Sequence, residues 1–298
     1  MPLRTSSTTP SPARRPARRL AGAVTAVTAV VVAAASSLAL TASSGQASAP
    51  AQRAATHWSD VAIANPASFP VTELVGQFPL PKLGATEVHL SLSRWGYRYQ
   101  AGMANNRLTI TEVDGGLRFV DTAARSWAKL PRTCTRLKIG RAAAAQCPIP
   151  SAFAGGMFIE TWPKLGNDSV DASTLSARFR LWALTDDGSD TVRGGAGNDF
   201  INTAFMADRA WGGAGDDWIR VGTGANEIYG DAGSDRLVGG DHDDRIHGGD
   251  GDDRLGGLLG NDTLWGDAGA DILVGGPGSD TAYLDATDRA REIESMRR

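Results

Sequence analysis

An aspartate, replaced once by asparagine, recurs at every ninth residue through the last third of the chain. These residues occupy position six of eleven consecutive nonapeptides: Asp190, Asp199, Asp208, Asp217, Asn226, Asp235, Asp244, Asp253, Asp262, Asp271 and Asp280. Regular stacking of such units would align their carboxylates, which repel one another unless cations neutralise them. Carboxylates and turn carbonyls together form an oxygen-only ligand set that suits Ca²⁺. The spacing therefore predicts several bound calcium ions.

The remaining positions of each nonapeptide indicate the element that must hold the aspartate. A glycine-rich stretch precedes it, as in GGAGNDFIN from Gly194 and GGAGDDWIR from Gly212, and glycine tolerates the positive φ of tight turns. Position eight is always apolar: Val192, Ile201, Ala210, Ile219, Ile228, Leu237, Ile246, Leu255, Leu264, Leu273 and Ala282. Each unit thus supplies a turn and a short strand with one inward side chain. Because one such side chain makes no core, the units must stack into a solenoid.

These residues resemble the RTX (repeats-in-toxin) nonapeptide, G-G-x-G-x-D-x-U-x. The resemblance implies an all-β fold with a parallel β-roll, in which two nonapeptides form one coil and loops on one edge lie 18 residues apart. It also implies calcium between successive loops, held by aspartates and glycine-loop carbonyls. The implied metal site residues are Gly195, Gly197, Asp199, Gly213, Gly215, Asp217, Gly233, Asp235, Gly249, Gly251, Asp253, Gly269, Asp271, Asp244, Asp262 and Asp280. Residues 85–184 are more loosely similar to the lead-in of secreted actinobacterial RTX-like proteins.

Sorting the loops by edge predicts two unequal rows of sites. The regular edge, with loops 194–199, 212–217, 230–235, 248–253 and 266–271, stays close to the consensus. The other edge, here the irregular edge, carries the marked departures: Met206 and His242 at the fourth glycine, Ala204 and Leu258 at the second, and Asn226 at position six. We expect a regular calcium row on the first edge. We expect incomplete binding on the second, best toward its C-terminal end.

Position nine on the strands of the irregular edge carries large side chains at 18-residue spacing. They are Arg193, Trp211, Tyr229, His247, Trp265 and Tyr283. On one sheet face they would stack as a ladder, beside alternating charges at Arg209, Glu227 and Arg245. Three alternatives are open: the ladder stabilises a narrow sheet, the N-terminal domain covers it, or it offers a surface for a glycan or protein partner. The aromatic residues of that surface would be Trp211, Tyr229, Trp265 and Tyr283.

The net charge of −3 conceals a steep gradient along the 298 residues. Residues 1–49 carry +5, residues 50–184 carry +6, residues 185–283 carry −14, and residues 284–298 are neutral. The acidic stretch disfavours nucleic acid as a partner and favours metal cations.

Residues 1–49 are predicted to be a cleaved signal peptide, exported by the general secretory rather than the twin-arginine route. The features that predict it are the arginine-rich leader, the uncharged run 20–40 and the small residues Ala47-Ser48-Ala49. The alternative is a membrane anchor; cleavage predicts a secreted, extracellular chain without a stable membrane span.

The middle of the chain predicts further β-structure. Proline-rich residues 50–84 read as a linker or lead-in, residues 85–184 as a small β-rich domain, and residues 284–298 as a C-terminal cap or tail. We expect residues 108–120 to form a hairpin and residues 158–162 and 178–184 to form strands. Cys134 and Cys147 are expected to pair in an exported chain, with a zinc site as the alternative.

The sequence lacks three common catalytic motifs. H-E-x-x-H, G-x-S-x-G and the phosphate-binding G-x-x-x-x-G-K are absent from the sequence. We therefore expect no catalytic residues and a secreted calcium-binding protein with a structural or adhesive role. The alternative is an extracellular hydrolase or other enzyme with an unrecognised N-terminal site. A buried, convergent pair such as Glu160 with Asp168 or Asp171 would favour it.

Overall fold

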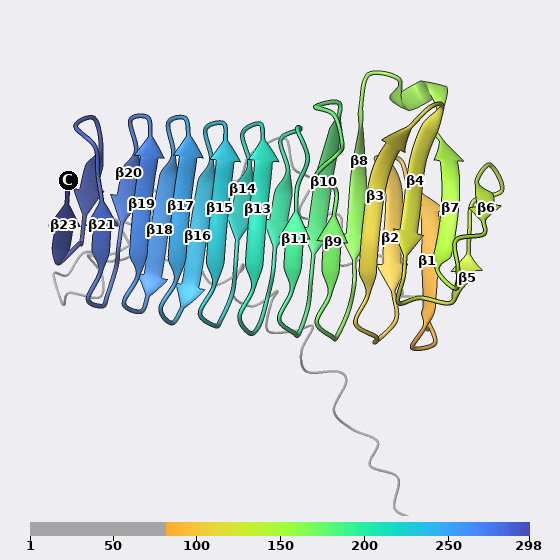
Figure 1. The fold of residues 1–298 in the computed structure, drawn as a ribbon, viewed down its shortest axis with the longest axis horizontal. Helices are drawn as coiled ribbons and strands as arrows, with labels where there is room; N and C mark the ends of the chain where they lie inside the picture. The colour runs from red at the N-terminus through yellow and green to blue at the C-terminus, as the bar shows by residue number, and fades with distance from the viewer. Residues whose placement is uncertain (1–81) are drawn as a thin grey trace, which may run out of the picture. The chain divides into compact units, whose positions relative to one another are not determined.

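The computed structural model describes residues 82–298, and the expected signal peptide and most of the linker lie outside them. Two β-sheets run along the described chain (Figure 1). The eleven-stranded sheet contains, in spatial order, β22 (Arg289–Arg291), β20 (Ile272–Val274), β18 (Arg254–Leu259), β16 (Arg236–Asp241), β14 (Trp218–Arg220), β12 (Phe200–Asn202), β10 (Phe179–Leu184), β8 (Met157–Trp162), β2 (Gly96–Ala101), β1 (Glu87–Leu92) and β5 (Ser126–Lys129).

The twelve-stranded sheet is built in the same way. Its spatial order is β23 (Ser295–Arg297), β21 (Thr281–Tyr283), β19 (Thr263–Ala268), β17 (Arg245–Asp250), β15 (Glu227–Ala232), β13 (Arg209–Ala214), β11 (Thr191–Arg193), β9 (Ser169–Asp171), β3 (Arg107–Val113), β4 (Gly116–Asp121), β7 (Ala143–Pro148) and β6 (Thr135–Leu137). Through the repeat, successive strands alternate between the two sheets. Two nonapeptides therefore make one coil.

The register of the repeat strands confirms the predicted parallel β-roll. Val192 pairs with Ala210 in one sheet, and Ile201 pairs with Ile219 in the other. Each partner lies 18 residues further along, and this spacing persists from β11 to β21. All eleven position-eight side chains are buried, as the sequence predicts. One inward residue per strand thus builds a continuous core only by stacking.

The N-terminal strands extend the same two sheets. β3 and β4 form the predicted hairpin, with Leu108 opposite Asp121, and antiparallel strands close this end of the structure. The predicted disulfide is present between Cys134 and Cys147, beside β6 and in β7. The one helical element among residues 82–298 is a 3₁₀ turn, η1 (Ser151–Phe153). No helix in this part of the chain has the length and apolar character to cross a membrane.

One coil of the solenoid precedes the nonapeptides that the sequence reveals. Asp171 of β9 pairs with Arg193 of β11, and Trp182 of β10 pairs with Phe200 of β12. Asp171 and Arg193 are 22 residues apart, four more than in a standard coil, because the loop between β9 and β10, residues 172–178, is longer. The stretch 166–170, which looks like a stray repeat out of frame, is therefore stacked on the roll.

Candidate calcium-binding site

The position-six residues form two columns, one on each edge of the roll. On the regular edge, the backbone N–H of Asp199 donates to Asp217 Oδ1 at 2.7 Å, and the N–H of Asp217 donates to Asp235 Oδ1 at 2.7 Å. The same bond joins Asp190 to Asp208, 18 residues on, along the irregular edge at 2.8 Å. Each column continues in this way to Asp271 or Asp280. The structure thus brings together the aspartates that the sequence predicts as metal ligands.

Only half of each carboxylate is satisfied by these bonds. Every position-six residue is about 1% exposed. The second carboxylate oxygen, Oδ2, is buried without a hydrogen-bond partner in Asp190, Asp208, Asp217, Asp235, Asp253, Asp262, Asp271 and Asp280. Asp199 and Asp244 differ, because their Oδ2 atoms accept the N–H groups of Gly195 at 2.7 Å and Gly240 at 2.8 Å. Buried, unpaired anionic oxygens are costly unless a cation compensates them.

Burial also changes the protonation of these columns. Desolvation raises the pKa of each carboxyl, and neighbouring carboxylates raise several further. The pKa is raised to about 6 for Asp208 and Asp235, to about 7 for Asp190, Asp199, Asp244, Asp253, Asp262 and Asp271, and to about 10 for Asp217. Burial therefore destabilises the charged form of the position-six carboxyls along the roll.

The glycines allow the loops to stack closely. A Cβ on Gly251 would lie 2.1 Å from Gly233 O, and a Cβ on Gly269 would lie 1.9 Å from Gly251 O. The glycine at position one faces its own aspartate, and a Cβ on Gly212 would lie 2.2 Å from Asp217 Oδ2. Loop carbonyls and carboxylate oxygens therefore approach one another within a small space.

This donor set fits calcium better than a transition metal. No group of three or more acidic, histidine or cysteine side chains suited to a metal ion gathers within residues 82–298. Each loop except that of Asn226 offers one buried, position-six carboxylate, so carbonyls of adjacent glycine-rich turns are expected to complete the coordination shell. Calcium accepts six to eight oxygen ligands in flexible geometry, including backbone carbonyls. The orphaned Oδ2 atoms are the feature that such an ion would satisfy.

Asn226 shows how the irregular edge differs. Its Nδ2 donates to Gly224 O at 2.7 Å and to Asp244 Oδ1 at 3.0 Å. The amide thus joins a turn carbonyl to the next carboxylate, two oxygens of the kind that a cation would otherwise bridge. The irregular edge therefore has an internal substitute for positive charge at this coil.

Several non-glycine residues adopt the left-handed conformation at glycine positions. On the irregular edge these are Met206, His242 and Leu258, with φ of 79°, 83° and 85°. Asp231 and Asp267 do the same on the regular edge, with φ of 73° and 65°. Both edges therefore contain backbone strain, and departures from the second glycine occur on the regular edge as well as on the irregular edge.

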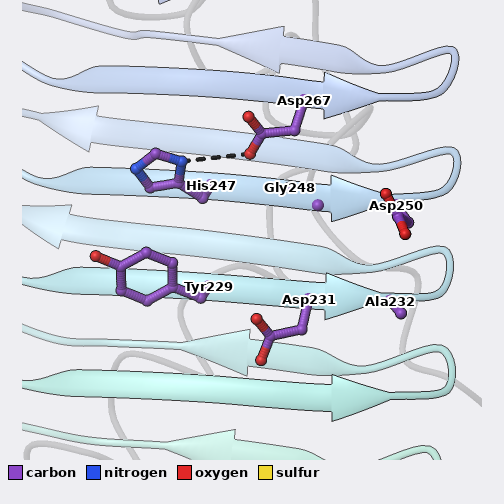
Figure 2. Close-up of a pocket in the computed structure, with 8 residues that line it drawn as sticks. Tyr229, Asp231, Ala232, His247, Gly248, Asp250 and Asp267 are labelled. Carbon is purple, nitrogen blue, oxygen red and sulfur yellow. Dashed lines mark hydrogen bonds and ion pairs between the residues drawn. The ribbon is translucent and has the colours of Figure 1, made fainter.

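The aromatic ladder lies on the outer face of the twelve-stranded sheet, as predicted. The rings of Trp211, Tyr229, His247, Trp265 and Tyr283 stack with centroid distances of 4.1–5.4 Å and interplanar angles of 5–8°. Arg193 lies over the first ring at 3.8 Å and Arg297 over the last at 5.6 Å. Figure 2 shows Tyr229 and His247 side by side, with His247 reaching toward Asp267 at 3.3 Å. The ring faces are thus occupied by one another and by the two arginines.

The acidic residues that would favour an enzyme have different hydrogen-bond partners. Glu160 lies on β8 and pairs with Arg98 on β2, at 2.6 Å between Oε2 and Nε. Asp168 accepts the backbone N–H of Asn106 at 2.6 Å, at a loop on the irregular edge. Asp171 accepts from Ser173 at the end of β9 in the other sheet. The three carboxylates therefore serve separate local structures.

Sequence reasoning missed the groups that close the columns at the C-terminal end. The N–H of Asp271 donates to Asp288 Oδ1 at 3.1 Å, and the N–H of Asp280 donates to Glu294 Oε2 at 2.7 Å. These acceptors follow 17 and 14 residues later, so the nine-residue period gives no signal for them. Residues 284–298 form the last, shortened coil through β22 and β23.

Comparison with known proteins agrees with the geometry of the repeat. The family described as the RTX calcium-binding nonapeptide repeat (4 copies) matches residues 184–204, 206–237, 220–255, 229–264 and 247–282. No curated protein and no solved structure shows a significant match to the chain. The matched region coincides with the two columns of buried aspartates. Residues 184–282 are therefore RTX calcium-binding nonapeptide repeats, folded as a β-roll.

Proposed function

We propose that this is an extracellular calcium-binding protein whose β-roll becomes stable as calcium binds, and that its role is structural or adhesive. The row of buried Oδ2 atoms without partners is the observation that carries the proposal. Several uncompensated carboxylates along a narrow core oppose folding, so ion binding contributes directly to the folding free energy. The disulfide between Cys134 and Cys147 suits an oxidising compartment.

The regular edge is the main ion-binding row in this proposal. Its loops supply Asp199, Asp217, Asp235, Asp253 and Asp271, with carbonyls from the adjacent glycine turns. On the irregular edge the amide of Asn226 supports incomplete occupancy, because it already bridges the oxygens of Gly224 and Asp244.

The ladder has a structural role in this proposal. Its ring faces are stacked on one another, so a glycan could not lie flat on them as it does on isolated aromatic side chains. Each stacked aromatic pair contributes about 0.5–1.5 kcal/mol. We assign no catalytic activity, since Glu160 and Asp168 serve separate local contacts.

Circular dichroism of the full chain tests the proposal. In chelator the β signal of the roll should be reduced, and micromolar to millimolar calcium should restore it, whereas magnesium should not. A chain that keeps its full β signal and melting temperature after chelation would show that the roll does not depend on calcium.

A further inference from the structure

The column on the irregular edge extends beyond the repeats, to Asp168. The N–H of Asp168 donates to Asp190 Oδ1 at 2.8 Å, and Asp168 Oδ1 in turn accepts the N–H of Asn106 at 2.6 Å. A Cβ on Gly188 would lie 2.0 Å from Gly166 O, so the two turns are in close contact. The loops behave as successive coils although their aspartates are 22 residues apart, and residue 168 lies outside the segments matched by the repeat family.

Asp168 has the same unsatisfied oxygen as the repeat aspartates. It is 2% exposed, and its Oδ2 and that of Asp190 are buried without hydrogen-bond partners. The charged groups that act on Asp168 include Asp190 and Asp121, both acidic. A carboxylate placed among carboxylates in this way needs a cation to be stable in its charged form.

Asp121 provides a comparison within the same region. It is fully buried, yet its Oδ1 accepts the backbone N–H groups of Arg107, Ala123 and Ala124. Its Oδ2 accepts Tyr99 Oη at 2.5 Å and Asn106 Nδ2 at 2.7 Å. The fold therefore satisfies one buried carboxylate completely and leaves its neighbour, Asp168, half satisfied.

A neutral hydroxyl oxygen lies beside the Asp190 carboxylate. Thr185 occupies position one of the Asp190 loop, where the regular edge has glycine, and its buried hydroxyl lies near the Asp190 carboxyl. The Thr185 Oγ1 is shielded from solvent, and the Asp190 carboxyl is the polar group with which it interacts. The orphaned carboxylate oxygens and this hydroxyl together form a donor set for a hard cation.

We propose that a divalent cation of calcium's size binds between the Asp168 and Asp190 loops, ligated by the Oδ2 atoms of both and by the Thr185 hydroxyl. This site rests on the proposed calcium-binding function and adds an ion to the N-terminal side of the matched repeats. It joins β9 to the first repeat strand, β11, and so fastens the N-terminal strands to the roll. The irregular edge then binds at its N-terminal end as well, ahead of the interruption at Asn226.

Asp168→Asn in the full chain tests the site. Asn226 shows that an amide at position six is accommodated and can donate to a turn carbonyl, so the variant should keep its fold. Asp171→Asn is the matched control, since Asp171 lies half-exposed three residues further along. Calcium stoichiometry is measured by equilibrium dialysis and the fold by circular dichroism.

We expect Asp168→Asn to bind one calcium ion fewer than the wild type and Asp171→Asn to bind the same number. An unchanged stoichiometry in Asp168→Asn would overturn the proposal. If that variant does not fold, Thr185→Val decides: a weakening of one ion by about tenfold supports the site, and unchanged binding overturns it. Failure of the calcium-binding function itself is distinct, because the wild type would then bind no calcium at all.

Discussion

The calcium-free roll should lose stability as the pH rises, which is the reverse of the usual behaviour of buried, ion-paired aspartates. Folding raises the pKa of Asp199 and Asp253 from 3.8 to about 7, so the folded chain holds protons that the unfolded chain has released. Stability is therefore present at low pH and is lost between pH 4 and the folded pKa near 7. Between pH 5 and pH 7 the ionisation of each such carboxyl lowers the free energy of unfolding by ~2 kcal/mol, because a pKa shift of one unit corresponds to about 1.36 kcal/mol.

Six carboxyls have pKa values raised to about 7, and the effect of even two of them is a large fraction of the ~5–15 kcal/mol that stabilises an ordinary domain. Thermal melts followed by circular dichroism, in metal-free buffer at pH 5 and pH 7.5, measure this loss. With saturating calcium the order should reverse, because the ligands must be deprotonated to bind the ion. Equal melting temperatures at the two pH values without metal would refute the reasoning.

Three substitutions, the first with a matched control, test individual features. Gly212→Ala should destabilise the calcium-loaded protein by about 1–3 kcal/mol in thermal melts, because the new Cβ would lie 2.2 Å from Asp217 Oδ2; Gly155→Ala, where a Cβ meets no atom within 4 Å, should change stability by less than about 0.5 kcal/mol. His242→Gly should stabilise by about 1 kcal/mol, raising the melting temperature by about 2–4 °C, since it removes a side chain from a backbone φ of 83°; no increase would argue against strain there. Asn226→Asp should destabilise the calcium-free chain by about 1–3 kcal/mol and increase the number of calcium ions bound in equilibrium dialysis, and an unchanged stoichiometry would contradict the role given to the amide.

The features that follow the 18-residue coil could be predicted from the sequence. The inward column from Val192 to Ala282, the stacked rings from Trp211 to Tyr283 and the pairing of aspartates all depend on one period that the chain keeps without a gap. In a parallel coil, residues 18 positions apart become neighbours on adjacent strands, so the sequence spacing predicts which side chains are in contact.

The ends of the roll could not be predicted in this way. Four additional residues between positions 172 and 181 take Asp168 out of frame, although hydrogen bonds place it in the column. Asp288 and Glu294 close the other end at shortened spacing. The N-terminal strands pair partly antiparallel, through contacts between distant segments such as β4 and β7, for which a repeat gives no information.

A crystal structure of the full chain grown in calcium, with anomalous scattering used to locate the ions, tests the central claim most directly. The ions should lie in a row along the regular edge, between successive loops, at 2.3–2.6 Å from the Oδ2 atoms of residues such as Asp217 and Asp235. Well-ordered loops with no anomalous peak beside those oxygens would contradict the account.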